Sequence, residues 1–208
     1  MERKNIVRWL LGLSAIFILL YLVFWPGVYP QITNYPPRDG SIIAFGDSLV
    51  YGTGGAAGYD FVSLLAEKAE EPIENFGIPG DTTATGLARL DTVIEKHPRI
   101  VLLLLGGNDY LRQIPREQTF KNLEAIILRL EGDGTIVVLL GVRGGLLVDH
   151  FDSDFEELAK RMGTAYVPDV LDGLFGNAQF MSDGIHPNDE GYQRIAEKIS
   201  PVLLRVLH

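Results

Sequence analysis

Five short segments with strand character, four of them apolar, are separated by stretches with helical spacing. This pattern constrains the fold of the chain more than any other feature of its sequence. The clearest run covers residues 100–105 and is aliphatic without alternation. Such a run is typical of a strand that is buried on both faces of a parallel sheet. Strands that alternate with helices predict an α/β fold, here a three-layer α/β/α sandwich with a flavodoxin-like five-stranded parallel sheet. We expect the strands near residues 43, 74, 102, 138 and 166.

The segments between these runs carry apolar residues at intervals of three and four, which is the spacing of an amphipathic helix. Asp60 precedes the first of these segments and is a residue type that caps helix N-termini. We expect the helices to cover residues 60–70, 82–94, 115–130, 153–162 and 190–204.

The first apolar run, residues 42–45, breaks directly into Gly-Asp-Ser-Leu at residues 46–49. This puts a small polar residue at the carboxyl end of a buried strand, where open α/β sheets carry their sites. Ser48 is therefore a candidate nucleophile, although serine is also a common turn residue and the tetrapeptide alone leaves both interpretations open. The nucleophile elbow G-x-S-x-G does not match, because Val50 stands where its second glycine belongs.

A segment near the C-terminus, Asp-Gly-Ile-His-Pro at residues 183–187, supplies the partners that a serine nucleophile needs. Serine is a weak nucleophile at neutral pH, so it needs a base, and the base needs an acid to hold its tautomer and orientation. Asp183 stands three residues before His186 on one tight loop with glycine and proline. This single loop is thus expected to supply both the base and its orienting acid.

Four separated blocks of the sequence resemble, in the same order, those of the GDSL or SGNH family of serine hydrolases. They are residues 46–49, 75–82, 106–109 and 183–187. The resemblance covers about residues 41–204 and is nearest to the bacterial thioesterase, lysophospholipase and arylesterase branch. It implies the sandwich fold, catalysis by Ser48, His186 and Asp183, and no cofactor.

An acyl hydrolase also needs hydrogen-bond donors aimed at the oxygen that becomes negative during the reaction. The resemblance assigns this oxyanion hole to Ser48, Gly80 and Asn108. Two backbone N–H groups and one side-chain amide could act as these donors, although Gly80 and Asn108 taken singly are also ordinary turn residues. The acids beside these residues are expected to fix loop geometry: Asp47, Asp81 and Asp109.

Residues 142–148 follow the fourth strand and should overhang the same edge of the sheet. Their apolar side chains, on a loop hinged by glycine, predict an acyl-binding pocket formed by Val142, Leu146 and Leu147. Packing of this loop on the hydrophobic core is the alternative, and the sequence leaves it open.

The bulk composition narrows the possible partners. A formal net charge of −9 without a basic stripe argues against nucleic acid, whose phosphates require clustered lysine and arginine. The chain has no cysteine, and its four histidines are scattered without ligand spacing. A metal is therefore not implied.

The N-terminal region is organised differently from the rest of the chain. Basic residues are followed by residues 9–25, which carry no charge and would span roughly 26 Å as a helix. We expect an uncleaved membrane anchor within residues 1–25, a proline-rich linker over residues 26–40, and the hydrolase domain over residues 41–208. The domain would then lie on the extracytoplasmic side, and a cleaved signal peptide with secretion is the alternative.

Together these features predict a serine hydrolase that cleaves carboxylic acyl esters or thioesters of small molecules or lipids through an acyl-enzyme. A carbohydrate O-acetylesterase would use the same residues on a different acceptor. A binding module without activity would retain the fold alone. Labelling of Ser48 by a fluorophosphonate and hydrolysis of esters of increasing chain length separate these alternatives.

Overall fold

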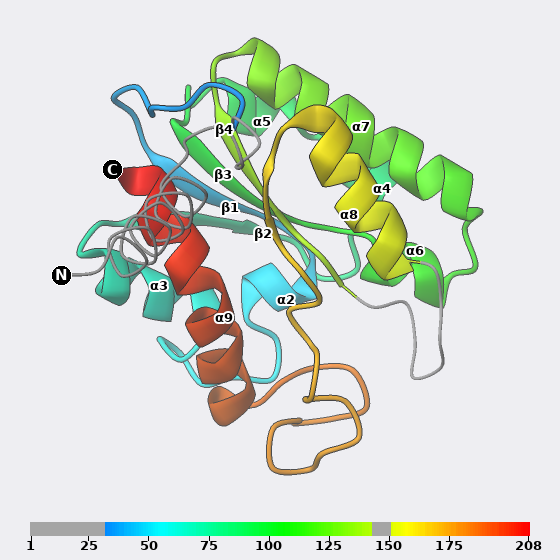
Figure 1. Cartoon of the computed structure of the whole chain (residues 1–208). Helices are drawn as coiled ribbons and strands as arrows, with labels where there is room; N and C mark the ends of the chain where they lie inside the picture. The colour runs from blue at the N-terminus through cyan, green and yellow to red at the C-terminus, as the bar shows by residue number, and fades with distance from the viewer. Residues whose placement is uncertain (1–31, 143–150) are drawn as a thin grey trace, which may run out of the picture. The chain divides into compact units, whose positions relative to one another are not determined.

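The computed structural model describes residues 32–142 and 151–208. Their centre is a parallel sheet with the strand order β2-β1-β3-β4-β5 (Figure 1). This is the flavodoxin-like order, which reverses between β1 and β3. The predicted five-stranded parallel sheet is thereby confirmed. The strands are β1 (Ile42–Gly46), β2 (Ile73–Gly77), β3 (Ile100–Leu104), β4 (Ile136–Leu140) and β5 (Ala165–Val167).

The three central strands, β1, β3 and β4, are buried along their whole length, as their unbroken aliphatic sequences predict. The registers of β1 place Gly46 beside Gly77 of β2 and Leu104 of β3. A side chain at Gly46 would put its Cβ only 2.1 Å from the Leu104 carbonyl oxygen. Glycine is therefore required where the chain leaves β1, directly before the serine.

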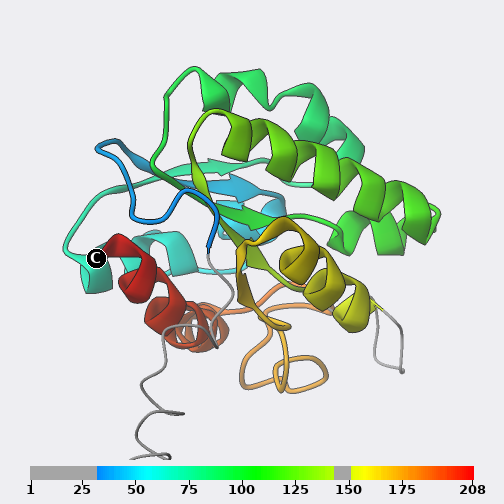
Figure 2. The same ribbon diagram turned by 45° about the horizontal axis from the view of Figure 1, so that its top comes forward.

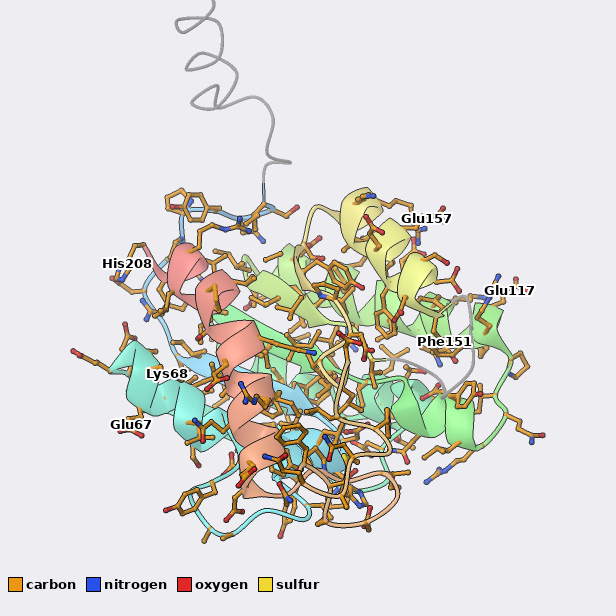
Figure 3. The ribbon with its side chains drawn as sticks, turned by 60° about the horizontal axis from the view of Figure 1, so that its bottom comes forward. Glu67, Lys68, Glu117, Phe151, Glu157 and His208 are labelled. Carbon is orange, nitrogen blue, oxygen red and sulfur yellow. The ribbon has the colours of Figure 1, made fainter. Side chains whose placement is uncertain are left out.

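The helices cover both faces of the sheet. α3 and α9 pack together on one face, whereas α4, α7 and α8 lie on the other (Figure 2). Figure 3 shows the same separation, with Lys68 of α3 and His208 after α9 at one side and Glu157 of α8 at the other. The helices are α2 (Ser48–Tyr51), α3 (Phe61–Ala69), α4 (Thr83–Ala88), α5 (Asp91–Ile94), α6 (Gly107–Leu111), α7 (Arg116–Gly132), α8 (Phe151–Met162) and α9 (Asp189–Leu207).

The helix predicted over residues 82–94 is broken, and this prediction was wrong. α4 ends before Arg89 and α5 begins at Asp91. The Arg89 side chain turns away from the helix axis to an ion pair with Asp81 and to the carbonyl ends of β1 and β2. The short helices α2 and α6 were also missed, because four or five residues are too few for a helical period to be visible.

Residues 32–40, at the end of the predicted linker, are hydrogen-bonded to the rest of the domain. The Thr33 N–H donates to the Gly163 carbonyl over 2.9 Å, and Arg38 pairs with Asp133 over 2.7 Å. The rest of the predicted linker and the predicted anchor lie outside the described residues. Across the two described segments, no helix is both long enough and apolar enough to cross a bilayer.

Candidate active site

Ser48 stands where β1 ends and α2 begins. Asp47 caps this short helix, because its Oδ1 accepts a hydrogen bond of 3.0 Å from the Leu49 N–H. The loop-fixing role expected for Asp47 is thereby confirmed. As the first residue of a helix, Ser48 has a backbone N–H without an intrahelical acceptor. Both its hydroxyl group and its amide are therefore presented at the carboxyl edge of the sheet.

Asp183 and His186 lie in the long segment between β5 and α9, drawn in yellow to orange in Figure 1. An antiparallel bridge between Met181 and Pro187 closes their loop. Inside it, Asp183 Oδ1 accepts hydrogen bonds from the backbone N–H groups of Ile185 at 2.8 Å and His186 at 2.7 Å. The acid and the histidine thus share one tight loop, as the sequence predicts.

The structure brings the predicted serine, histidine and aspartate into one hydrogen-bonded line. His186 Nε2 lies 3.1 Å from Ser48 Oγ, and His186 Nδ1 lies 2.7 Å from Asp183 Oδ2. The His186 ring and the backbone N–H groups of Ile185 and His186 hold the pKa of Asp183 at about 2. An ionised Asp183 favours the tautomer with hydrogen on Nδ1, which leaves Nε2 as an acceptor toward the serine.

The glycine-rich loop after α2 holds the Asp183 loop in position. Gly54 has a φ of +96°, and a Cβ there would lie 2.3 Å from Ser182 Oγ and 2.5 Å from the Pro187 carbonyl oxygen. The Tyr192 hydroxyl of α9 donates to the Thr53 carbonyl over 2.7 Å. The loop after α2 therefore contacts both the Asp183 loop and α9, which lie far from it in the sequence.

Gly80 and Asn108 lie on neighbouring segments after β2 and β3. Asn108 Nδ2 donates to the backbone carbonyl of Asp81 over 2.9 Å, which joins α6 to the Gly80 loop. No hydrogen bond among the described residues uses the Gly80 N–H. Asn108 lines the same pocket as Ser48 and His186. The residues named by the sequence are therefore clustered at one edge of the sheet.

Two arginines that the sequence reasoning did not single out fix the Gly80 loop. Arg112, at the end of α6, donates to the Gly80 carbonyl over 2.8 Å. Arg89 donates through Nε to Asp81 Oδ2 over 2.6 Å and stacks on the Phe45 ring. Arg112 follows the third motif block by three residues and Arg89 follows the second by seven, and these positions do not reveal what either arginine contacts.

Asp109 lies in α6, is fully buried, and holds this helix in place. Its carboxylate accepts hydrogen bonds from the Thr83 N–H at 2.8 Å, the Thr83 hydroxyl at 2.5 Å and the Thr119 hydroxyl at 3.3 Å. These bonds link α6 to α4 and α7. These contacts agree with the loop-fixing role expected for Asp109. The ion pair with Arg89 agrees with the same role for Asp81.

A small pocket of about 60 Å³ opens over the serine. Val142 lines it, at the place predicted for an acyl-binding residue, while Leu146 and Leu147 lie outside the described residues. A larger cavity of about 630 Å³ adjoins the small pocket, and three apolar residues line both. These shared residues are Leu111, Phe175 and Ile185.

The sequence reasoning missed these three shared residues, because an apolar side chain that faces a cavity looks like a core residue in a sequence. Leu111 and Ile185 are nevertheless well exposed, at 55% and 41%. In the described part of the chain, no three histidine, aspartate or glutamate side chains converge into a potential metal site.

The strand order, together with a serine after β1 that is hydrogen-bonded through a histidine to an aspartate, defines a hydrolase of the α/β sandwich class. The chain belongs to the GDSL-like Lipase/Acylhydrolase family, whose sequence model matches residues 44–194. It is a carboxylic ester hydrolase of this family.

Characterised relatives resemble the chain over most of their length. It is 31% identical to the esterase TesA of Pseudomonas aeruginosa over 80% of this chain and 89% of the relative. It is 30% identical to the thioesterase 1/protease 1/lysophospholipase L1 of Escherichia coli over 95% of this chain and 93% of the relative. A crystal structure of TesA superposes with a TM-score of 0.74 at 31% identity, covering 80% of this chain and 99% of that one.

Proposed function

We propose that this enzyme cleaves carboxylic acyl esters or thioesters through an acyl-enzyme formed on Ser48. The hydrogen-bonded line from Asp183 through His186 to Ser48 carries the proposal, because it supplies a nucleophile, a base and an orienting acid in reach of one another. The names of the relatives, which include an esterase and a thioesterase that is also a lysophospholipase, favour acyl substrates of small molecules or lipids.

In the first half of the reaction, Ser48 Oγ attacks the substrate carbonyl carbon while His186 Nε2 accepts the hydroxyl proton. The tetrahedral intermediate collapses, and the leaving alcohol or thiol takes that proton from His186. Asp183 stabilises the imidazolium in the interval without accepting the proton itself. In the second half, His186 activates a water molecule in the same way, and the acid product leaves with Ser48 restored.

The oxygen that becomes negative needs donors that are already in place. We assign this role to the backbone N–H groups of Ser48 and Gly80 and to the Asn108 side chain. The free N–H at the start of α2 and the ties that Arg112 and Asn108 make to the Gly80 loop support this assignment. All three donors come from segments that follow adjacent strands, so the sheet itself limits their relative motion.

The two adjoining cavities favour a substrate with an apolar part longer than an acetyl group. The small pocket has room for the reacting group only, whereas the larger cavity is lined mostly by apolar side chains, with Tyr110 and Met181 among them. We therefore expect esters with longer chains to be better substrates than acetates. A carbohydrate O-acetylesterase would show the opposite preference.

The test is hydrolysis of p-nitrophenyl esters from acetate to palmitate, run beside an acyl-CoA and a lysophospholipid. Ser48→Ala and His186→Ala should each remove nearly all turnover without unfolding the domain, because the members of a triad act as a unit. A fluorophosphonate should label the wild-type serine and leave Ser48→Ala unlabelled. Retention of a tenth of the wild-type kcat by Ser48→Ala would exclude this mechanism.

We also propose that residues 9–25 anchor the enzyme in a membrane, with the domain on the extracytoplasmic side, on the basis of their uncharged sequence and the basic residues before them. The full chain should then remain with the membrane fraction after a high-salt wash. A chain starting near Arg38 should be released and active. Recovery of a mature protein that begins near residue 27 would show a cleaved signal instead.

A further inference from the structure

The Asn108 amide has two hydrogens, and both face acceptors within the protein. One is donated to the Asp81 carbonyl over 2.9 Å, and the other faces Asp47 Oδ2 across a longer distance of 3.4 Å. The second carboxyl oxygen of Asp47 is already fixed by the Leu49 N–H. The amide hydrogen that an oxyanion would need is therefore shared with the buried carboxyl group of Asp47.

The groups around Asp47 make its charge depend on pH near neutrality. Its side chain is only 3% exposed, and burial raises the pKa of Asp47 to about 7. Asp81 raises it further, whereas the Leu49 N–H and the His186 ring oppose the rise. Tyr192 of α9 also faces this carboxyl group, and burial raises the pKa of its own hydroxyl further above neutrality, so it remains uncharged. Burial outweighs the opposing effects of the Leu49 N–H and the His186 ring on the pKa of Asp47.

Protonation of Asp47 changes what Asn108 can do. A carboxylate binds an N–H group roughly twice as strongly as a neutral acceptor does, so ionised Asp47 competes with the oxyanion for the amide hydrogen. It also brings a negative charge next to the position where a second one develops. Neutral Asp47 weakens the competition and removes the negative charge. The shorter hydrogen bond to the Asp81 carbonyl holds the Asn108 amide group in place whether Asp47 is ionised or neutral.

We propose that Asp47 is a positioning residue that releases the Asn108 amide hydrogen to the oxyanion when its carboxyl group is neutral and retains that hydrogen when it is ionised. The inference rests on the proposed role of Asn108 as a donor. Under this proposal, the buried carboxyl group of Asp47, next to Ser48, has a function beyond capping α2. The ionisation of Asp47 would then limit the reaction on the alkaline side.

The experiment is the pH dependence of kcat with the full-length enzyme and p-nitrophenyl butyrate, from about pH 5 to about pH 9. In the wild type, kcat should fall by about tenfold or more above neutrality, and by no more than the about 100- to 1000-fold that complete loss of one oxyanion donor produces. Asp47→Asn should abolish this alkaline decrease. Its Oδ1 still accepts from the Leu49 N–H, and its amide then meets Asn108 as a second donor, which cannot hold the hydrogen.

The control is Glu131→Gln. Burial raises the pKa of Glu131 to about 7 as well, but this residue lies near the end of α7, before the amino-terminal end of β4 and therefore at the opposite edge of the sheet. Glu131→Gln should keep the alkaline decrease of kcat. If Asp47→Asn does not fold, Asp47→Ser keeps a capping oxygen for Leu49 and removes the titrating group.

Coupling between the two residues gives the decisive measurement. Asn108→Ala should have a low kcat that no longer falls above neutrality, and adding Asp47→Asn to it should change nothing. An alkaline decrease that survives in Asp47→Asn overturns the proposal. So does a decrease that survives in Asn108→Ala, since Asp47 would then act through Ser48 or His186. Full activity of Asn108→Ala at all pH values would instead refute the donor role on which the inference rests.

Discussion

Arg89 offers the strongest test of how the site is supported. Its guanidinium pairs with Asp81 and donates to the carbonyl groups of Gly46 and Phe76, each over 2.9 Å. The two charged side chains are only 17% and 10% exposed. We consider Arg89→Met, which keeps most of the side-chain volume and its packing on the Phe45 ring but removes the charge and all donors.

The expected loss follows from these contacts. Removing one partner of a buried ion pair typically costs about 3 to 5 kcal/mol, because the other charge stays buried without compensation. The Gly46 carbonyl keeps the Ile78 N–H as a second donor at 3.0 Å, so little is added there. We therefore expect about 4 kcal/mol, against a total of about 5 to 15 kcal/mol for a typical domain. The melting temperature should fall by roughly 8 to 16 °C.

The assay is urea unfolding followed by far-UV circular dichroism, since residues 26–208 contain no tryptophan. Arg129→Met is the matched control, because Arg129 pairs with Asp91 on the surface and should cost less than about 1 kcal/mol. Adding Asp81→Asn to Arg89→Met should recover part of the loss by removing the uncompensated charge. If Arg89→Met destabilises the domain no more than Arg129→Met does, the ion pair does not support the site.

Three further predictions concern the catalytic groups. Asn108→Ala should lower kcat about 100- to 1000-fold with little change in KM, because a hydrogen bond to the oxyanion strengthens only in the transition state. A normal kcat with a lower melting temperature would instead indicate that Asn108 has a purely structural role. Asp183→Asn should reduce kcat by on the order of 10³-fold or more, because its amide would face His186 Nδ1 and favour the wrong tautomer; steady-state kinetics with an unchanged circular dichroism spectrum checks this. Folding raises the pKa of Asp47 from 3.8 to about 7, so between these values the folded state binds the extra proton and wild-type stability falls as pH rises. Asp47→Asn should therefore gain stability relative to the wild type by about 1.4 kcal/mol per pH unit across that window, and parallel urea titrations that show no such gain would contradict it.

The sheet could be predicted because its strands carry their own signal. A strand such as β3, buried on both faces, must be apolar throughout, and the length and spacing of such runs leave little choice of architecture. The catalytic serine, aspartate and histidine could be predicted for a related reason. Asp183 and His186 lie three residues apart on one loop, so their contact is local, and the end of β1 marks the serine.

The parts that could not be predicted depend on contacts between distant segments. Arg89 interrupts a helical pattern because it reaches two strand ends, and nothing in the local sequence reports those carbonyl groups. The approach of Asp47 to Asn108 requires the end of β1 and the start of α6 to be placed within ångströms of each other. Ile185 and Phe175 were missed because hydrophobicity alone does not distinguish a cavity wall from a core.

The contact between Ser48 and His186 joins segments that are 138 residues apart in the sequence, whereas Asp183 and His186 lie on the same loop. Local opening of that loop would separate the nucleophile from an intact acid and base pair while the sheet stays folded. Heat inactivation should then begin below the temperature at which the circular dichroism signal melts, and it should reverse on cooling. The Gly54 and Tyr192 contacts, which close this junction, would set the upper working temperature of the enzyme more than its hydrophobic core does.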